Sequence, residues 1–204
     1  MNECDSSAVD TRSGRMRGVT GGAPLLSLLL AVAPAAAAGC GASAPVQPLT
    51  GPTWVCSPVG LSITLPEGWV LHEGGLLAQG NPAHLLDAVA PGAVTRGGLN
   101  LTVFGVPAPE GESLDQLVLG NLEALRRSNP GLEVRDQKRI QVKGIPVHRV
   151  LCRLPGERGG KSQLLYTLRE EGHLVALTFS ADREFEDEVE AVGKAVVESL
   201  TPEG

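Results

Sequence analysis

Four strand-like segments follow one another in the second half of the chain, with short links between them. Lys143-Gly144 joins the first two segments, and Glu171-Gly172 closes a tight hairpin between the last two. Strands joined this closely pair antiparallel, because a parallel crossover needs on the order of a dozen residues. The sequence therefore predicts an antiparallel sheet built on residues 132–142, 145–154, 162–170 and 173–180.

Two amphipathic helices are predicted to cover this sheet. The first runs from Ser113 to Ser128, where Ser113 and Gln116 form a Ser-x-x-Gln capping-box pattern ahead of an apolar stripe. The second is the terminal helix, which runs from Asp182, the expected N-cap, to Leu200.

The segment before the first helix gives two further strands and one ambiguous stretch. Leu61 to Leu65 and Leu99 to Val103 alternate apolar and polar residues, which is the period of a half-buried strand. Residues 76–98 are ambiguous, with a short helix expected around His84 to Val89 and a Gly-rich loop after it. The predicted fold class is α+β, an antiparallel sheet of about six strands covered by helices in an α/β/α sandwich.

An apolar run near the N-terminus predicts an exported protein. Leu25 to Ala38 reads LLSLLLAVAPAAAA, which is too short to span a bilayer and contains Pro34, but it fits the apolar region of a signal peptide. We therefore expect residues 1–39 to be a signal peptide. Residues 1–15 are expected to be an untranslated extension, because a start at Met16 gives the short basic lead-in that signals carry.

The residues after this run indicate a membrane anchor. Ala37-Ala38-Gly39-Cys40 resembles the bacterial lipobox, and the resemblance implies a lipid on Cys40 and a protein of the cell envelope that faces the periplasm or the exterior. The alternative is an ordinary cleaved signal followed by a chance cysteine. Residues 40–53 are uncharged and rich in Gly, Ala and Pro, so they predict a flexible tether to a single domain at 54–204.

The order of these elements resembles the Mog1/PsbP-like fold across residues 54–200. The resemblance is carried by LPEGW, LNLTVFGV, the helix SLDQLVLGNLEAL, VKGIPVHRV, LVALTFSA and the terminal VVESL. These motifs are structural and none is catalytic. The family contains a Ran-GTPase-binding protein, an extrinsic photosystem subunit and small bacterial lipoproteins, so the resemblance implies a binding or assembly role and transfers no site residue.

The search for catalytic and metal-binding motifs supports the same interpretation. The sequence has no nucleophile elbow, no phosphate-binding loop and no zinc-ligand spacing, so no enzyme activity, metal or cofactor is predicted. His84 and Asp87 would share a helix face and are expected to be a solvated pair. His148 is in phase with Val150 and Cys152, which predicts a partly buried histidine.

Charge and cysteines give the remaining candidate residues. The net charge of −6 argues against nucleic-acid binding. Arg149 and Arg153 share strand parity in a basic stretch, which predicts either a surface for an anionic partner or an exposed sheet edge kept soluble by charge. Cys56 and Cys152 are a candidate disulfide in an oxidising compartment, the alternative being two buried free thiols.

These observations favour a non-catalytic protein-interaction or assembly module, anchored to a membrane by Cys40 and meeting a protein partner. The alternative function is a carrier or sensor of a small ligand that binds in a cleft between sheet and helix.

Overall fold

The fold is described from a computed structural model, which describes residues 49–73, 83–93, 97–156 and 159–203. The predicted signal peptide, Cys40 and most of the predicted tether lie outside the described residues. Part of the ambiguous stretch at residues 76–98 also lies outside them.

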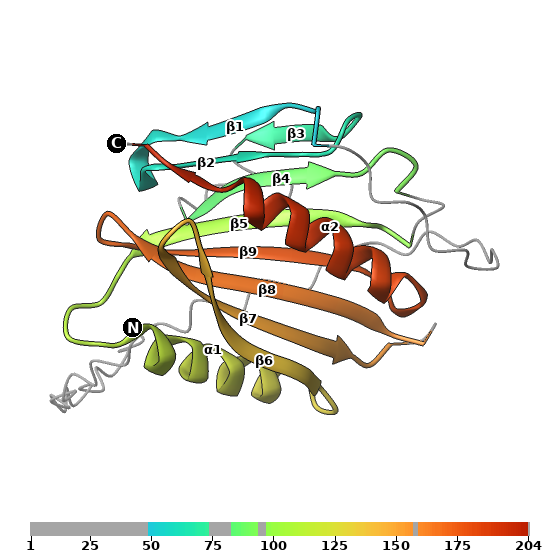
Figure 1. The fold of residues 1–204 in the computed structure, drawn as a ribbon. Coiled ribbons are helices and arrows are strands. Elements are labelled where there is room, and N and C mark those ends of the chain that lie inside the picture. The colour runs from blue at the N-terminus through green and yellow to red at the C-terminus, as the bar shows by residue number, and fades with distance from the viewer. Residues whose placement is uncertain (1–48, 74–82, 94–96, 157–158, 204) are drawn as a thin grey trace, which may run out of the picture.

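A seven-stranded antiparallel sheet forms the centre of the domain (Figure 1). Its spatial order is β3-β4-β5-β9-β8-β7-β6, so the four consecutive strands expected from the sequence lie side by side. The bounds are β3 (Val70–Glu73), β4 (His84–Val89), β5 (Asn100–Pro107), β6 (Glu133–Val142), β7 (Ile145–Leu154), β8 (Lys161–Glu170) and β9 (His173–Asp182). The antiparallel α+β architecture predicted from the sequence is confirmed.

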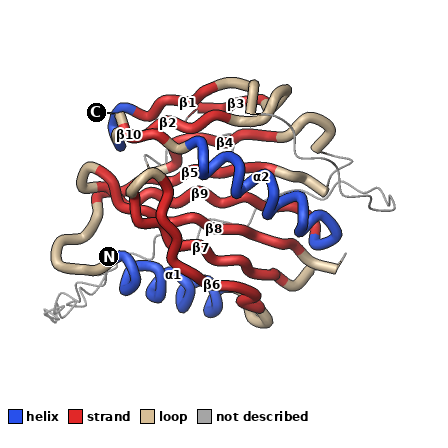
Figure 2. The backbone as a smooth tube through the Cα atoms, viewed as in Figure 1, coloured by secondary structure: helices blue, strands red, loops and turns tan. Residues whose placement is uncertain are grey.

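Two helices and a small second sheet complete the described part of the chain (Figure 2). The helices are α1 (Leu114–Ser128) and α2 (Glu186–Ser199), and the small sheet has the order β1-β2-β10. Its strands are β1 (Thr53–Cys56), β2 (Leu61–Thr64) and β10 (Thr201–Pro202), with the 3-10 turns η1 (Ser57–Val59) and η2 (Arg183–Phe185) elsewhere. None of the helices in the described ranges is both long and apolar enough to cross a membrane.

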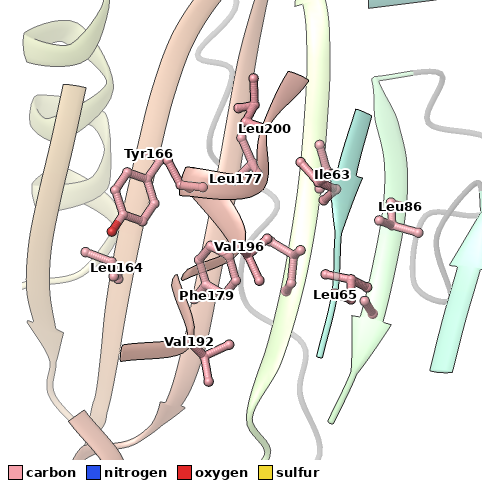
Figure 3. Close-up of a cluster of buried hydrophobic side chains, with 14 of the residues drawn as sticks. Ile63, Leu65, Leu86, Leu164, Tyr166, Leu177, Phe179, Val192, Val196 and Leu200 are labelled. Carbon is pink, nitrogen blue, oxygen red and sulfur yellow. The ribbon is translucent and has the colours of Figure 1, made fainter. Parts of the chain in front are cut away.

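Two apolar cores lie on opposite faces of the large sheet. Leu164 and Tyr166 on β8 point into the larger core under α2 and the small sheet, whereas Leu165 between them points into the smaller core under α1. Figure 3 shows the larger core, where Tyr166 and Phe179 meet edge to face with ring centroids 6.2 Å apart. The chain is thus a layered α/β/α arrangement.

Several of these elements begin or turn at the residues that local sequence patterns predicted. Ser113 accepts a hydrogen bond from the Gln116 backbone N–H, and the Gln116 side chain accepts one from the Ser113 N–H, which is the expected capping box. Lys143-Gly144 and Glu171-Gly172 both have positive φ at each residue, the backbone that two-residue hairpin turns require.

Two local expectations were wrong. His84 to Val89 forms strand β4, because Leu86 and Ala88 are fully buried on one face and the segment pairs with both β3 and β5. Asp182 does not cap the terminal helix, since η2 intervenes and the Asp182 side chain makes no capping hydrogen bond. In both places tertiary pairing overrides a local preference.

Candidate functional site

A cleft of about 780 Å³ lies between α2 and the strands β6, β7 and β8. Helix α2 packs against β8 and β9, so the same face of the edge strand β6 is left beside it as a groove. Arg149 and Tyr166 lie in the floor, Lys138 lies on the β6 side, and Glu190 lies on the α2 side. The cleft has the size and mixed lining of a binding site.

Arg149 holds the floor of the cleft together. Its Nη1 donates to Asp136 on β6 and its Nη2 donates to Glu190 on α2. The Arg149 side chain is only 8% exposed, whereas both carboxylates are about 40% exposed. The guanidinium therefore links the edge strand to the helix, and its charge is compensated by groups that remain in contact with water.

Arg153 makes a second, bidentate link to α2. Its Nε and Nη2 donate to the two oxygens of Glu186 at 2.7 and 2.6 Å, and Ser162 Oγ donates to Glu186 at 2.6 Å. Hydrogen bonds from Arg153 hold the pKa of Glu186 below its usual range, although partial burial opposes this effect. Strand β7 and α2 are thus joined by two parallel ion pairs.

Tyr166 lies in the floor of the cleft, and Lys143 lies at one end of it. Burial raises the pKa of Tyr166, while the neighbouring Arg149 acts in the opposite direction. Lys143 Nζ in the β6–β7 turn donates to the Ser199 carbonyl at 3.2 Å and to Thr201 Oγ1 at 3.1 Å. The hairpin turn therefore reaches the C-terminal end of α2, where a cation is favourable.

Paired charges are the main chemical feature of this cleft. Arg149 and Arg153 are engaged with carboxylates, and no serine or cysteine nucleophile lines the cleft. Across the described ranges, no three His, Cys, Asp or Glu side chains come together as a metal-binding group. The arrangement offers charged hydrogen-bonding groups beside apolar groups such as Ile140 and Val142.

A separate polar cluster fixes α1 to the other face of the sheet. His148 Nε2 lies 3.0 Å from Asp115 Oδ1 in the first turn of α1, and Arg139 Nε donates to the same oxygen at 2.7 Å. His148 is 6% exposed, and its Nδ1 has no hydrogen-bond partner in the part of the chain described. Burial and the nearby Arg139 charge lower the pKa of His148.

Acid is expected to destabilise the protein in two steps. The folded-state pKa of His148 lies below 6.5, so stability falls as pH drops below about 6.5, where the unfolded chain takes up the proton first. Glu186 is also lowered, from 4.5, so its contribution is present above that pH and is lost as pH falls through its folded-state pKa. Urea unfolding midpoints measured across this pH range should show both losses.

Two variants separate the steps. We expect His148→Gln to flatten the dependence near pH 6.5 and leave the lower one, and Glu186→Gln to do the reverse. An unchanged profile for His148→Gln would assign the first loss to another group.

His84 and Asp87 form a buried pair, where a solvated pair was expected. Both are 6% exposed, and His84 Nε2 lies 2.9 Å from Asp87 Oδ1, which also accepts from Thr102 Oγ1 at 2.9 Å. Residues three apart in a regular strand point to opposite faces, but an irregularity between His84 and Leu86 brings these two together. A helix was predicted to bring His84 and Asp87 close together, whereas an irregular strand does so.

The expected disulfide is absent from the structure. Cys56 and Cys152 are both free and buried, Cys56 in the larger core and Cys152 in the smaller core across the sheet. The strand pattern could not show this, because it gives the parity of each residue and not the layer into which its strand folds.

Thiol labelling checks this arrangement. We expect peptides containing Cys56 and Cys152 to be fully alkylated in denaturant without a reductant, and prior reduction to add nothing. In the native state Cys152 should resist alkylation, because it is fully buried and its pKa is raised to about 12. Detection of a peptide pair linked through these cysteines would contradict the assignment.

The structure brings the predicted partner-binding residues Arg149 and Arg153 to one face and engages each with α2. Lys138 belongs to the basic stretch seen in the sequence, whereas Tyr166 and Glu190 were not predicted to lie beside these residues. One signal was present: Glu186 and Glu190 are four residues apart on one helix face, matching the two arginines on one strand face.

Comparisons with known proteins give a family and a fold. A family model described as DcrB matches residues 62–199. No curated protein sequence matches the chain.

Three solved structures share the Mog1/PsbP-like fold, which confirms the resemblance seen in the sequence. Cyanobacterial PsbP (CyanoP) from Synechocystis is 15% identical, with 79% of this chain and 98% of that chain covered and a TM-score of 0.57. The Saccharomyces cerevisiae Ran-binding protein Mog1p is 10% identical, with coverage of 74% and 95% and a TM-score of 0.54. LpqN from Mycobacterium tuberculosis is 12% identical, with coverage of 69% and 82% and a TM-score of 0.52.

Proposed function

The chain belongs to the DcrB family, and from that premise we propose that it is a non-catalytic interaction module of the cell envelope, held to a membrane by lipid on Cys40. The observation that carries the proposal is the apolar leader that ends in Ala37-Ala38-Gly39-Cys40. An export signal of this kind, followed by an uncharged tether, suits a domain that works beside a membrane.

The fold supports an interaction role. Among the proteins that share it, Mog1p is described as Ran-binding and LpqN as involved in cell envelope biogenesis. The cleft beside α2 offers paired charges and apolar surface rather than a nucleophile with its base. Arg149 and Arg153 serve this role by holding α2 in place, so that the cleft keeps its shape.

Replacement of Cys40 tests the anchor. We expect the full chain to take up a labelled fatty acid and sediment with membranes, and Cys40→Ala to lose both properties, because the thiol is the point of attachment. Cys56→Ala is the matched control and should keep both. Membrane association of Cys40→Ala without lipid would reject the anchor.

A small-ligand carrier is the second candidate, favoured by the cleft of about 780 Å³. Two experiments separate the candidates. In native mass spectrometry of the purified full chain, a single co-purifying small molecule supports the carrier. Crosslinking in cells to one protein partner supports the interaction module.

A further inference from the structure

We infer that the cleft between β6 and α2 binds an extended peptide segment of the protein partner, with acidic side chains toward β6 and basic side chains toward α2. The inference rests on the proposed interaction role and gives that role a surface and a ligand chemistry.

The edge of the large sheet is left uncovered beside α2. Strand β6 is the edge of the seven-stranded sheet, whereas α2 packs over β8 and β9 and is linked to β7 by the ion pairs of Glu190 with Arg149 and Glu186 with Arg153. Lys138 pairs in register with Arg149, and Ile140 pairs with Val147. Paired residues point to the same face of a sheet, so Lys138 and Ile140 lie on the face that α2 occupies over β8 and β9. The β7 members of these pairs are buried, with Val147 1% and Arg149 6% exposed, so the part of the floor that is open to a ligand lies along β6.

The two walls of the cleft carry opposite charge. The β6 side carries Lys138 and Lys143. The Lys138 side chain is 54% exposed and its Nζ lies 3.3 Å from Asp136 Oδ2, whereas Lys143 bonds only neutral oxygens, so this wall keeps an excess of positive charge. The α2 side is lined by Asp187, Glu190 and Glu198, with Lys194 as its single cation. Lys194 lies 3.9 Å from Glu198, and Glu190 binds Arg149 in the floor, so the acidic excess of this wall is carried by Asp187.

An extended peptide can match two walls of opposite charge. Successive side chains of a strand-like peptide point in opposite directions, with same-side residues about 7 Å apart. Acidic side chains at alternate positions can therefore face β6 while basic ones face α2. The backbone between them lies over the apolar groups of the floor, among them Ile140 and Val142.

The same charges argue against ligands of a single sign. A polyanion would meet the acidic α2 wall and a polycation the lysines of β6, and like charges placed together are unfavourable by several kcal/mol. Only a ligand with both signs, separated across its width, satisfies both walls.

The test measures binding of a defined peptide to the full chain in detergent. The probe is a capped, fluorescent peptide of alternating Glu and Lys, and the comparison is a block peptide of the same composition with all Glu residues first. Fluorescence anisotropy should show binding of the alternating peptide and at least tenfold weaker binding of the block peptide.

Charge reversal in the protein sharpens the test. We expect Lys138→Glu and Asp187→Lys each to weaken binding about tenfold, because each places like charges together. Arg127→Glu and Glu123→Lys make the same charge changes on exposed positions of α1, across the sheet, and should leave binding unchanged. Thermal unfolding of each variant confirms that it folds.

The double variant Lys138→Glu/Asp187→Lys should recover part of the binding, because an alternating peptide can turn about its axis and present its other side. Equal binding of the block peptide, or single reversals without effect, would overturn the inference. So would a small molecule found in the cleft. If the lipid anchor and a crosslinked partner are found in cells but the peptide does not bind, the cleft assignment is rejected and the interaction role stands.

Discussion

Gly193→Leu is expected to lower the free energy of unfolding by about 3 kcal/mol, because added volume in a packed core forces neighbouring side chains off their rotamers. Gly193 lies where α2 comes closest to the sheet. A Cβ there would be 2.7 Å from Leu164 Cδ2, 3.2 Å from Phe179 Cδ2 and 3.3 Å from Tyr166 Cε2. Leu164 could move aside for one methyl group, but a leucine must also displace two rings.

Gly120→Leu is the matched control. Gly120 is also inside a helix, but it lies on the exposed side of α1, and a Cβ there would have no neighbour within 4 Å. Leucine is a better helix former than glycine by about 0.5–1 kcal/mol, so this variant should be slightly more stable. Urea unfolding of both variants gives the comparison. Equal stability of the two would show that α2 does not approach the sheet this closely.

Removal of both carboxylates that bind Arg149 is expected to destabilise the fold by about 3 kcal/mol, because it leaves a buried charge without compensation. The variant is Asp136→Asn with Glu190→Gln, which keeps the size of each side chain. Each single change should cost less than half of that, since the remaining carboxylate still neutralises the guanidinium.

Removal of the Arg149 charge should lower the free energy of unfolding by less than removal of both carboxylates. Arg149→Met leaves two carboxylates that are about 40% exposed, and water can solvate both, so we expect a loss of about 1 kcal/mol. The asymmetry follows from burial, because only the arginine lies out of water. Urea unfolding of the four variants tests it, and equal costs for Arg149→Met and the double carboxamide would contradict it.

The candidate site could be predicted only in part from the sequence. Strand parity was enough to place Arg149 and Arg153 on one face. It could not show that α2 covers that face, because Glu186 and Glu190 are far along the chain and helix packing brings them in. Residues whose sequence pattern suggested a surface for partners therefore turned out to be linked to a neighbouring helix.

The sequence by itself determined the elements whose signals are local. The capping box at Ser113 begins α1, and positive-φ turns at Lys143-Gly144 and Glu171-Gly172 set the hairpins. Alternation of apolar and polar residues marks the strands β2 and β5. Each of these depends on residues within a few positions of one another, so a single chain segment contains the information.

Only the tertiary structure decided the strand β4, the separation of Cys56 from Cys152, and the cleft. Each depends on which segments, distant in sequence, lie in one layer: β4 on pairing with both neighbours, the cysteines on two cores, and the cleft on where α2 ends its cover of the sheet. A periodic pattern says that a face is buried or exposed, but what covers that face is set by long-range packing.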